Sequence, residues 1–252
     1  MSITAHCLVK NEENFIAYAI RSVIAFVEVI LIFDTGSTDR TPEIISGLAK
    51  EFPGKIIFEE KGECDKKRHT VLRQEMVDRT DTEWFMILDG DEVWTERGMG
   101  EAVGLIGEGN AEVIQSYFFE CVGDIFHTHY MPGYKTIRFA KNDDVAWQGD
   151  YSNDDLYSKK LAKPIIEVKK TVILKNKFWH ATHLIRSSVG GDSFSSGGIR
   201  SGKLAPTYFL IGRKIAEPIP EVFEMDKDKL AMSGLRSFIN FFPFAIKKLL
   251  PL

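Results

Sequence analysis

Short hydrophobic runs alternate with amphipathic segments along the first ninety residues. The runs are almost continuously apolar, as in strands of a parallel sheet that is covered on both faces. Between them, apolar residues recur at the spacing of one helix face. The pattern predicts strands at residues 2–9, 27–34, 55–60 and 83–89, and helices at residues 13–27, from residue 41 onward and at 65–79.

Local signals refine two of the predicted helices. Thr41, Pro42 and Glu43 are typical of a helix start, with Thr41 as the N-cap and Glu43 near the positive end of the helix dipole. Asp39, just before them, is expected to be a turn or cap residue rather than a ligand. In the helix at 65–79, the residues predicted to face the core are Val71, Leu72 and Met76.

Strands that alternate with helices are joined by right-handed crossovers and form a parallel sheet. Ligands of such sheets bind beyond the carboxyl ends of the strands. Polar residues 10–12, 34–39 and 89–92 all follow predicted strands. We therefore expect these three segments to meet at one edge of the sheet and to form a ligand site there.

The second half of the chain is less regular. Residues 112–122, 136–142 and 169–181 are predicted strands and indicate an antiparallel addition to the sheet. Residues 186–203 contain five glycines and six serines, which is typical of a flexible loop. Helices and an apolar tail are expected after it. The predicted fold class is α/β, a Rossmann-type mixed sheet flanked by helices with a helical C-terminal extension.

Composition narrows the class of protein. The chain has 252 residues, 44% of them hydrophobic, which is enough for a sizeable core. Its net charge of −4 argues against a nucleic-acid partner. The three cysteines are far apart and indicate reduced thiols. Without a signal-peptide core or a membrane-spanning run, we expect a cytoplasmic protein.

The stretch Asp34-Thr35-Gly36 raises the alternative of an aspartic protease. Such an enzyme needs two of these loops so that two carboxylates share one proton. This chain carries the tripeptide once, and the loop leads into a predicted helix rather than an all-β fold. The protease alternative is therefore rejected.

Asp89-Gly90-Asp91 follows an apolar strand. Two carboxylates this close repel each other unless a cation intervenes. Mg²⁺ and Mn²⁺ bind carboxylate and phosphate oxygens together, so the motif suits a nucleotide diphosphate held through a metal. An isolated Asp-x-Asp is more often a solvated turn, but this one shares a sheet edge with two other polar segments.

Four segments in order resemble the successive motifs of family-2 glycosyltransferases of the GT-A type, in the nucleotide-diphospho-sugar transferase superfamily. They are "LVKNEE" (8–13), "FDTGSTDRT" (33–41), "KKRHTVL" (66–72) and "MILDGDE" (86–92). The resemblance covers about residues 3–95. It implies a nucleotide-diphosphate-sugar donor, a divalent metal (Mn²⁺ or Mg²⁺) and inversion at the anomeric carbon.

The resemblance also implies roles for individual residues. Asp34 would contact the nucleobase, and Arg68 would lie near the base or the diphosphate, although the family often has Arg-Asn where this chain has Arg68-His69. The implied donor-binding residues are Val9, Asn11, Glu12, Asp34, Arg68, Asp89 and Gly90. The implied metal ligands are Asp89, Asp91 and His180, with His183 as the alternative histidine.

Inverting transfer needs a general base for the acceptor hydroxyl. In this family the base is an acidic residue after the donor half, often in a Glu-Asp pair. Residues 146–157 resemble that region, with Asn153 in place of the expected glutamate. We expect the base to be Asp154, with Asp155 as the alternative; an acidic surface loop remains the competing interpretation.

The sequence divides into a nucleotide-sugar half (residues 1–95), an acceptor half (96–185) and an extension (186–252). The Gly/Ser loop is a candidate lid that would bring Arg186, Arg200 and Lys203 to the diphosphate. Residues 234–252 are apolar and basic, which suits either the surface of an anionic membrane or packing against protein.

The sequence as a whole predicts a glycosyltransferase that moves sugar to an acceptor hydroxyl in envelope or surface glycan synthesis. The acceptor would be a glycan or a lipid-linked molecule, and an oligomer is an open alternative. A nucleotidyltransferase of related fold is less favoured because "HCLVKNEEN" (6–14) lacks the glycines of its phosphate loop. A non-catalytic binding module remains the third alternative.

Overall fold

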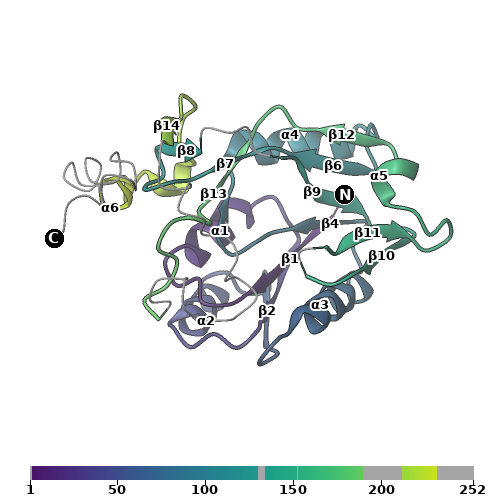
Figure 1. Cartoon of the computed structure of the whole chain (residues 1–252), viewed down its shortest axis with the longest axis horizontal. Coiled ribbons are helices and arrows are strands. Elements are labelled where there is room, and N and C mark those ends of the chain that lie inside the picture. The colour runs from purple at the N-terminus through teal and green to yellow at the C-terminus, as the bar shows by residue number, and fades with distance from the viewer. Residues whose placement is uncertain (1, 130–133, 152, 190–211, 232–252) are drawn as a thin grey trace, which may run out of the picture.

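The computed structural model describes residues 2–129, 134–151, 153–189 and 212–231. The first half alternates strands and helices as predicted (Figure 1). The elements are β1 (Ile3–Val9), α1 (Ile16–Val23), β2 (Val29–Asp34), α2 (Thr41–Glu51), β3 (Ile56–Glu60), α3 (Lys66–Asp78) and β4 (Trp84–Ile87).

The second half adds mostly short strands. Its elements are β5 (Glu92–Val93), α4 (Glu96–Gly107), β6 (Val113–Ser116), β7 (Phe118–Glu120), β8 (His127–His129), β9 (Thr136–Lys141), β10 (Val145–Gln148), β11 (Asp155–Ser158), α5 (Ile165–Val168), β12 (Thr171–Ile173) and β13 (Phe178–His180). The described part of the extension holds β14 (Gly212–Lys214), the 3₁₀ turn η2 (Glu221–Phe223) and α6 (Lys227–Leu230).

Within the described residues, the main sheet has seven strands in the order β12-β6-β9-β4-β1-β2-β3. The strands β4, β1, β2 and β3 are parallel, and β9 is antiparallel to both of its neighbours. The predicted mixed sheet with an antiparallel addition is therefore confirmed. A smaller sheet, β5-β13-β7, joins the segment after β4 to the second half of the chain.

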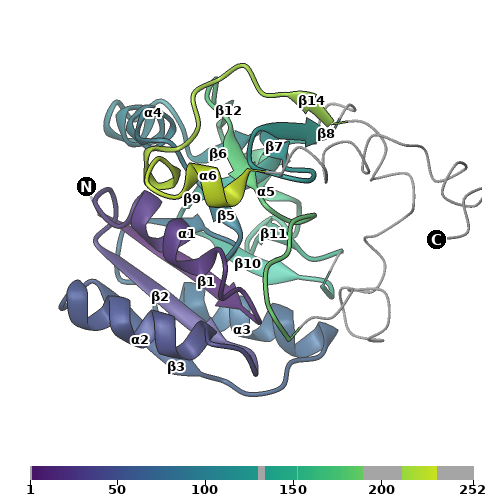
Figure 2. The same ribbon diagram turned by 90° about the vertical axis from the view of Figure 1, so that its left-hand side faces the viewer.

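Side chains that alternate along the strands supply two cores. On one face, Ala5, Cys7 and Ile32 pack with residues of α1, α2 and α4. On the other face, Phe33 packs against α3, and Phe85 against the β10–β11 hairpin and α5. Figure 2 shows α1 and α3 on opposite sides of the strands. The sheet is thus covered on both faces, which explains its continuous hydrophobic runs.

Two local predictions were wrong and one was confirmed. Val71 is 64% exposed, and Val77 takes the inward position beside Leu72 and Met76, which are buried as predicted. Thr41 is not the N-cap of α2, because its hydroxyl accepts a hydrogen bond from the Glu12 backbone instead. Asp39 accepts the N–H of Thr41, so its expected turn role is confirmed.

Two long predicted strands each divide between two sheets. Residues 112–122 form β6 in the main sheet and β7 in the small sheet. Residues 169–181 divide in the same way into β12 and β13. The predicted helix at 13–27 is also shorter than expected and ends at Val23. An apolar run does not by itself show which sheet each of its parts joins.

In the part of the chain that the structure describes, no helix is both long and apolar enough to cross a membrane. The tail at 234–252 lies outside the described residues, and so does most of the Gly/Ser loop. The division into 1–95, 96–185 and 186–252 stays a prediction.

Candidate active site

The three polar segments predicted from strand order meet at the carboxyl edge of β1, β2 and β4. The register pairs Val9 with Asp34, so these two strands end side by side. The loop after β4 lies against the loop after β1, because a Cβ added to Gly90 would be 3.0 Å from both Val9 and Glu12 side-chain atoms. Glycine at position 90 therefore allows the two loops to approach.

Asn11 joins the first two loops. Its backbone has a φ of 54°, which asparagine tolerates better than most residues. Its N–H donates to Ser37 Oγ (2.8 Å), and its Oδ1 accepts from the Thr38 N–H (2.8 Å). The Asn11 side chain thus stabilises the loop after β2. A direct contact between Asn11 and the sugar donor stays a prediction.

Asp34 is 2% exposed and its two carboxylate oxygens differ. Oδ1 accepts the backbone N–H groups of Gly36 (2.9 Å) and Ser37 (2.8 Å). Oδ2 is buried and accepts no hydrogen bond from any described residue. An acceptor in that condition is costly unless a ligand supplies the donor, so Asp34 is suited to bind an N–H of a ligand.

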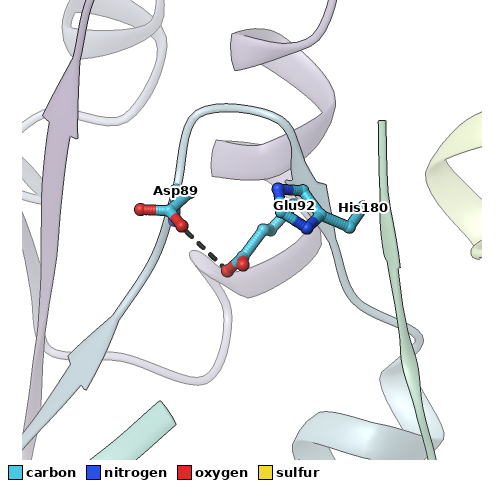
Figure 3. Close-up of side chains that lie close together, drawn as sticks. All are labelled: Asp89, Glu92 and His180. Carbon is cyan, nitrogen blue, oxygen red and sulfur yellow. Dashed lines mark hydrogen bonds between the residues drawn. The ribbon is translucent and has the colours of Figure 1, made fainter. Parts of the chain in front are cut away.

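Asp89, Glu92 and His180 form a cluster that could hold a metal ion. One ligand atom from each residue lies within 4.8 Å of the others. Figure 3 shows the two acids on one segment and His180 on the neighbouring strand; the Asp89 N–H donates to Glu92 Oε2 (3.3 Å). The pairing of β13 with β5 sets His180 opposite Glu92. Sequence reasoning missed Glu92, although it directly follows the Asp-Gly-Asp motif.

Asp91 and His180 also lie together. His180 Nε2 is 3.4 Å from Asp91 Oδ1, and His180 Nδ1 is buried without a hydrogen-bond partner among the described residues. The backbone of Ala181 donates to the Asp91 carbonyl (2.8 Å), which ties β13 to this loop. His183 contacts Glu120 (3.0 Å), whereas His180 contacts Asp91 of the acidic motif.

Arginines that the motif reading missed surround these acids. Arg138 contacts Glu92 and lies 3.7 Å from Asp89, and Arg73 lies 3.7 Å from the other oxygen of Asp89. Burial opposes ionisation of Asp89. The charges of Arg138 and Arg73 outweigh this effect and lower the pKa of the Asp89 carboxyl. Burial raises the pKa of Glu92 well above its usual range, although Arg138 opposes the rise.

Arg186 bridges two of the loops. Its Nη1 lies 2.9 Å from Asp91 Oδ2 and 3.0 Å from Glu12 Oε1. Glu12 is 1% exposed and Asp91 is 3% exposed, so the guanidinium offsets charge that water does not reach. Arg186 was expected near the donor; Arg200 and Lys203 lie outside the described residues.

Asp154 lies against α3. Asp154 Oδ2 is 3.6 Å from His69 Nδ1 and 3.8 Å from Arg73 Nε. Burial opposes ionisation of Asp154, but His69 and Arg73 outweigh it and lower the pKa of its carboxyl. Burial is the main cause that raises the pKa of Asp155. The Leu156 backbone N–H donates to Asp155 Oδ1 (2.8 Å). Asp154 therefore ionises at a lower pH than Asp155.

Arg68 has a different surrounding from the one expected. It is exposed, and its guanidinium donates to the backbone carbonyls of Lys61 and Glu63 in the loop before α3. The backbone N–H of Arg68 donates to Oδ1 of Asp65 (2.8 Å), the residue that caps the helix. One and a half turns further along α3, Arg73 contacts the acids instead. A donor role for Arg68 stays a prediction.

The residues present fit a divalent cation. Carboxylate oxygens with one imidazole nitrogen are ligands that Mn²⁺ and similar ions accept. His180 Nδ1, which is buried and has no hydrogen-bond partner among the described residues, and the nearby Asp91 are such ligands. Asp89, Asp91 and His180 as the ligand set stays a prediction, with Glu92 as an additional candidate.

Comparison with known proteins supports the architecture. The family model described as glycosyl transferase family 2 matches residues 7–180. The crystal structure of S. aureus TarS 1-349 in complex with UDP-GlcNAc is similar, with a TM-score of 0.51, 12% identity, and coverage of 83% of this chain and 64% of that one. No curated protein matches the chain.

Two further solved structures resemble it at lower TM-scores. S. aureus TarS 1-349 without that ligand has a TM-score of 0.47 and 11% identity, with coverage of 72% of this chain and 61% of that one. The mannosyltransferase PcManGT from Pyrobaculum calidifontis, in complex with GDP-Man and Mn²⁺, has a TM-score of 0.37 and 20% identity, with coverage of 44% and 34%. This chain spans less than two thirds of each of these proteins.

The predicted GT-A-like fold is thus confirmed by the sheet, by the match to the family model and by the likeness to TarS. Because the family model extends from β1 to the end of β13, it includes both the strand-end loops and His180. The chain belongs to glycosyl transferase family 2.

Proposed function

We propose that the chain transfers a sugar from a nucleotide-diphosphate sugar to an acceptor hydroxyl, with inversion and with help from a divalent metal. The observation that supports it most is the convergence of Glu12, Asp34 and Asp91, from three strand-end loops, with His180 from the second half of the chain. Family membership makes sugar transfer the chemistry to expect from this site.

The donor would lie along the carboxyl edge of β1, β2 and β4. Asp34 Oδ2 would accept an N–H of the nucleobase, since it is buried and lacks a described partner. Asp89, Asp91 and His180 would hold the metal. When bound, the metal would offset the charge that develops on the leaving diphosphate. Val9, Asn11, Glu12 and Gly90 would line the donor site.

The acceptor would be activated by Asp154. Its carboxylate is kept ionised by His69 and Arg73, so it can take the proton of the acceptor hydroxyl. Asp154 and Asp89 lie near the same guanidinium, because Arg73 is 3.8 Å from Asp154 and 3.7 Å from Asp89. A base there would face a sugar whose diphosphate is held near Asp89.

Hydrolysis of a panel of nucleotide sugars with Mn²⁺ tests the reaction, with Asp91→Asn as the inactive variant. Asp81→Asn is the matched control, because Asp81 is an exposed turn residue. We expect one donor to be hydrolysed by the wild type and the control but not by Asp91→Asn. Release of pyrophosphate from a nucleoside triphosphate would favour a nucleotidyltransferase instead. Inactivity on every donor, with a partner still bound, would favour a binding module.

The acceptor and the location belong to the same proposal. We infer a glycan or lipid-linked acceptor in envelope or surface glycan synthesis, reached from the cytoplasmic side of a membrane. The basic and apolar tail at 234–252 would provide the contact. Flotation with anionic liposomes, with and without residues 234–252, tests the contact. Equal flotation of both chains would refute it.

A further inference from the structure

Arg186 lies beside the proposed metal site. Its guanidinium lies 2.9 Å from Asp91 Oδ2, and Asp91 is one of the acids proposed to bind the metal. The Arg186 side chain is 17% exposed, so the contact is largely shielded from water. The other oxygen of Asp91 faces His180 at 3.4 Å. Both oxygens of this carboxylate are thus directed at nitrogen groups.

The backbone holds Arg186 at this position from a distant part of the sequence. Asn14 donates its N–H to the Arg186 carbonyl and its side-chain amide to the Ile185 carbonyl, both at 3.0 Å. The Ser188 N–H donates to Glu13 (2.6 Å). The segment after β13 is therefore fastened to the start of α1, and Arg186 points between the loops that follow β1 and β4.

Arg186 differs from the other two arginines around the acids. Arg73 and Arg138 belong to α3 and β9, and both contact Asp89. Arg186 lies outside any helix or strand, and its described ion-pair partners are Glu12 and Asp91. It is thus the one arginine of the three that contacts Asp91 in the described structure and that no regular element holds.

Asp91 cannot bind a guanidinium and a divalent ion at the same time as strongly as it binds either one alone. A guanidinium and a divalent ion beside the same carboxylate repel each other, and in a buried site that repulsion is screened less than at the surface. Without any cation, Glu12 and Asp91 would be two carboxylates buried side by side, which is unfavourable. In this structure Arg186 supplies a cation between the two acids.

We propose that Arg186 is the resident counter-cation of the metal site, and that it competes with the divalent ion for Asp91. In the donor-free protein the guanidinium stabilises the acids and lowers the affinity for metal. When the metal binds, Arg186 leaves Asp91 and keeps its contact with Glu12. Arg186 thereby determines how tightly the site binds metal before the donor arrives. This inference rests on the proposed function, because it requires a metal at Asp91.

Titration calorimetry of Mn²⁺ into the donor-free full chain tests the competition. We expect Arg186→Gln to bind Mn²⁺ at least about tenfold more tightly than the wild type. Arg186→Lys should lie between them, because lysine keeps the charge but its side chain is one bond shorter than the path to Nη1, the atom that contacts both carboxylates. The matched control is Arg21→Gln, since Arg21 forms an exposed pair with Glu51 and should leave the affinity unchanged. Asp91→Asn should weaken binding in every background.

Wild-type affinity, or weaker binding, in Arg186→Gln would overturn the competition. Circular dichroism checks that the glutamine variant is folded. If it is not, Arg186→Lys decides, and a lysine variant that binds Mn²⁺ like the wild type overturns the inference. Donor hydrolysis by the wild type separates the two proposals: hydrolysis with no change in Mn²⁺ affinity refutes this inference alone. Absence of Mn²⁺ binding in all variants refutes both it and the metal dependence.

Discussion

At the scale of single residues, the two carboxylate oxygens of Asp34 have different surroundings. Oδ1 closes the turn after β2 through two backbone N–H groups, and Oδ2 stays buried without a described partner. Leaving such an acceptor unsatisfied costs about 1–3 kcal/mol. A nucleobase N–H that binds Oδ2 would recover that cost and would contribute to the affinity for the donor.

We expect Asp34→Asn to weaken nucleotide binding by about tenfold to a hundredfold, because the amide can still close the turn but presents an N–H in place of Oδ2. The catalytic constant at saturating donor should fall less. Calorimetry with UDP and with GDP measures the affinity. Asp39→Asn is the control, since Asp39 also accepts backbone N–H groups beside α2. Equal nucleotide affinity in wild type and Asp34→Asn would contradict the role.

Asp154→Asn should lower the catalytic constant by about a hundredfold or more, because a general base contributes about 10²–10⁴. Nucleotide affinity should stay unchanged. Asp155→Asn is the paired variant and should have a much smaller effect, because only Asp154 contacts His69 and Arg73 in the described structure. Steady-state kinetics at saturating donor compares the two. A larger loss in Asp155→Asn would assign the base to Asp155 instead.

The pH dependence of His69→Phe reports on the same carboxylate. The pKa of Asp154 is lowered by His69 and Arg73 against burial, so loss of His69 raises that pKa. The base is then protonated at a higher pH. The acidic limb of the pH profile of the catalytic constant therefore moves to higher pH. Phenylalanine keeps the edge-on contact with Tyr151, whose ring centroid is 4.4 Å away. An acidic limb at its wild-type position would show that His69 does not act on the base.

At the scale of elements, the β10–β11 hairpin positions Asp154, the proposed base. The hairpin docks on α3, where the Trp147 N–H donates to Gln74 (2.8 Å) and the Trp147 ring lies 4.5 Å below the Arg73 guanidinium. Its turn depends on Gly149, with a φ of 96°, where an added Cβ would be 2.4 Å from the Asn153 carbonyl oxygen. Only glycine suits that backbone without moving the residues beside Asp154.

Gly149→Ala should therefore destabilise the fold by about 1–3 kcal/mol and displace Asp154. The catalytic constant should fall at least about tenfold while nucleotide affinity stays near the wild type. Gly104→Ala in α4 is the control, because nothing lies within 4 Å of its added Cβ and alanine favours a helix. Denaturant unfolding and kinetics measure both effects. A Gly149→Ala enzyme with wild-type turnover would show that the turn does not position the base.

The elements also show where sequence patterns succeed. The order and type of β1 to β4 follow from apolar runs, because burial on both faces makes each strand visible in its own residues. The patterns failed at β6–β7 and β12–β13, where one predicted strand divides between two sheets. They also failed at Val71, because the helix spacing places Leu72 and Val77 inward and leaves Val71 in solvent.

At the scale of the whole molecule, ligand binding should couple to stability. A donor analogue with Mn²⁺, each at about 100 times its dissociation constant, adds about 2.7 kcal/mol per site. For a domain of this size that raises the melting temperature by roughly 5–10 °C. Thermal-shift measurements over a panel of nucleotide sugars identify the donor by the largest shift. Asp91→Asn should lose the part that depends on Mn²⁺, and an equal shift in that variant would place the metal elsewhere.

The sequence by itself determined the parallel α/β core, the family resemblance and the edge at which Glu12, Asp34 and Asp89 meet. Those features depend on local pattern, because a strand, its following loop and the next helix are neighbours in the chain. Only the tertiary structure decided which cations surround the acids. Arg138 and Arg186 reach them from segments about 50 and 95 residues away along the chain. Such contacts leave no spacing in the sequence, since they depend on how the second half folds back over the first.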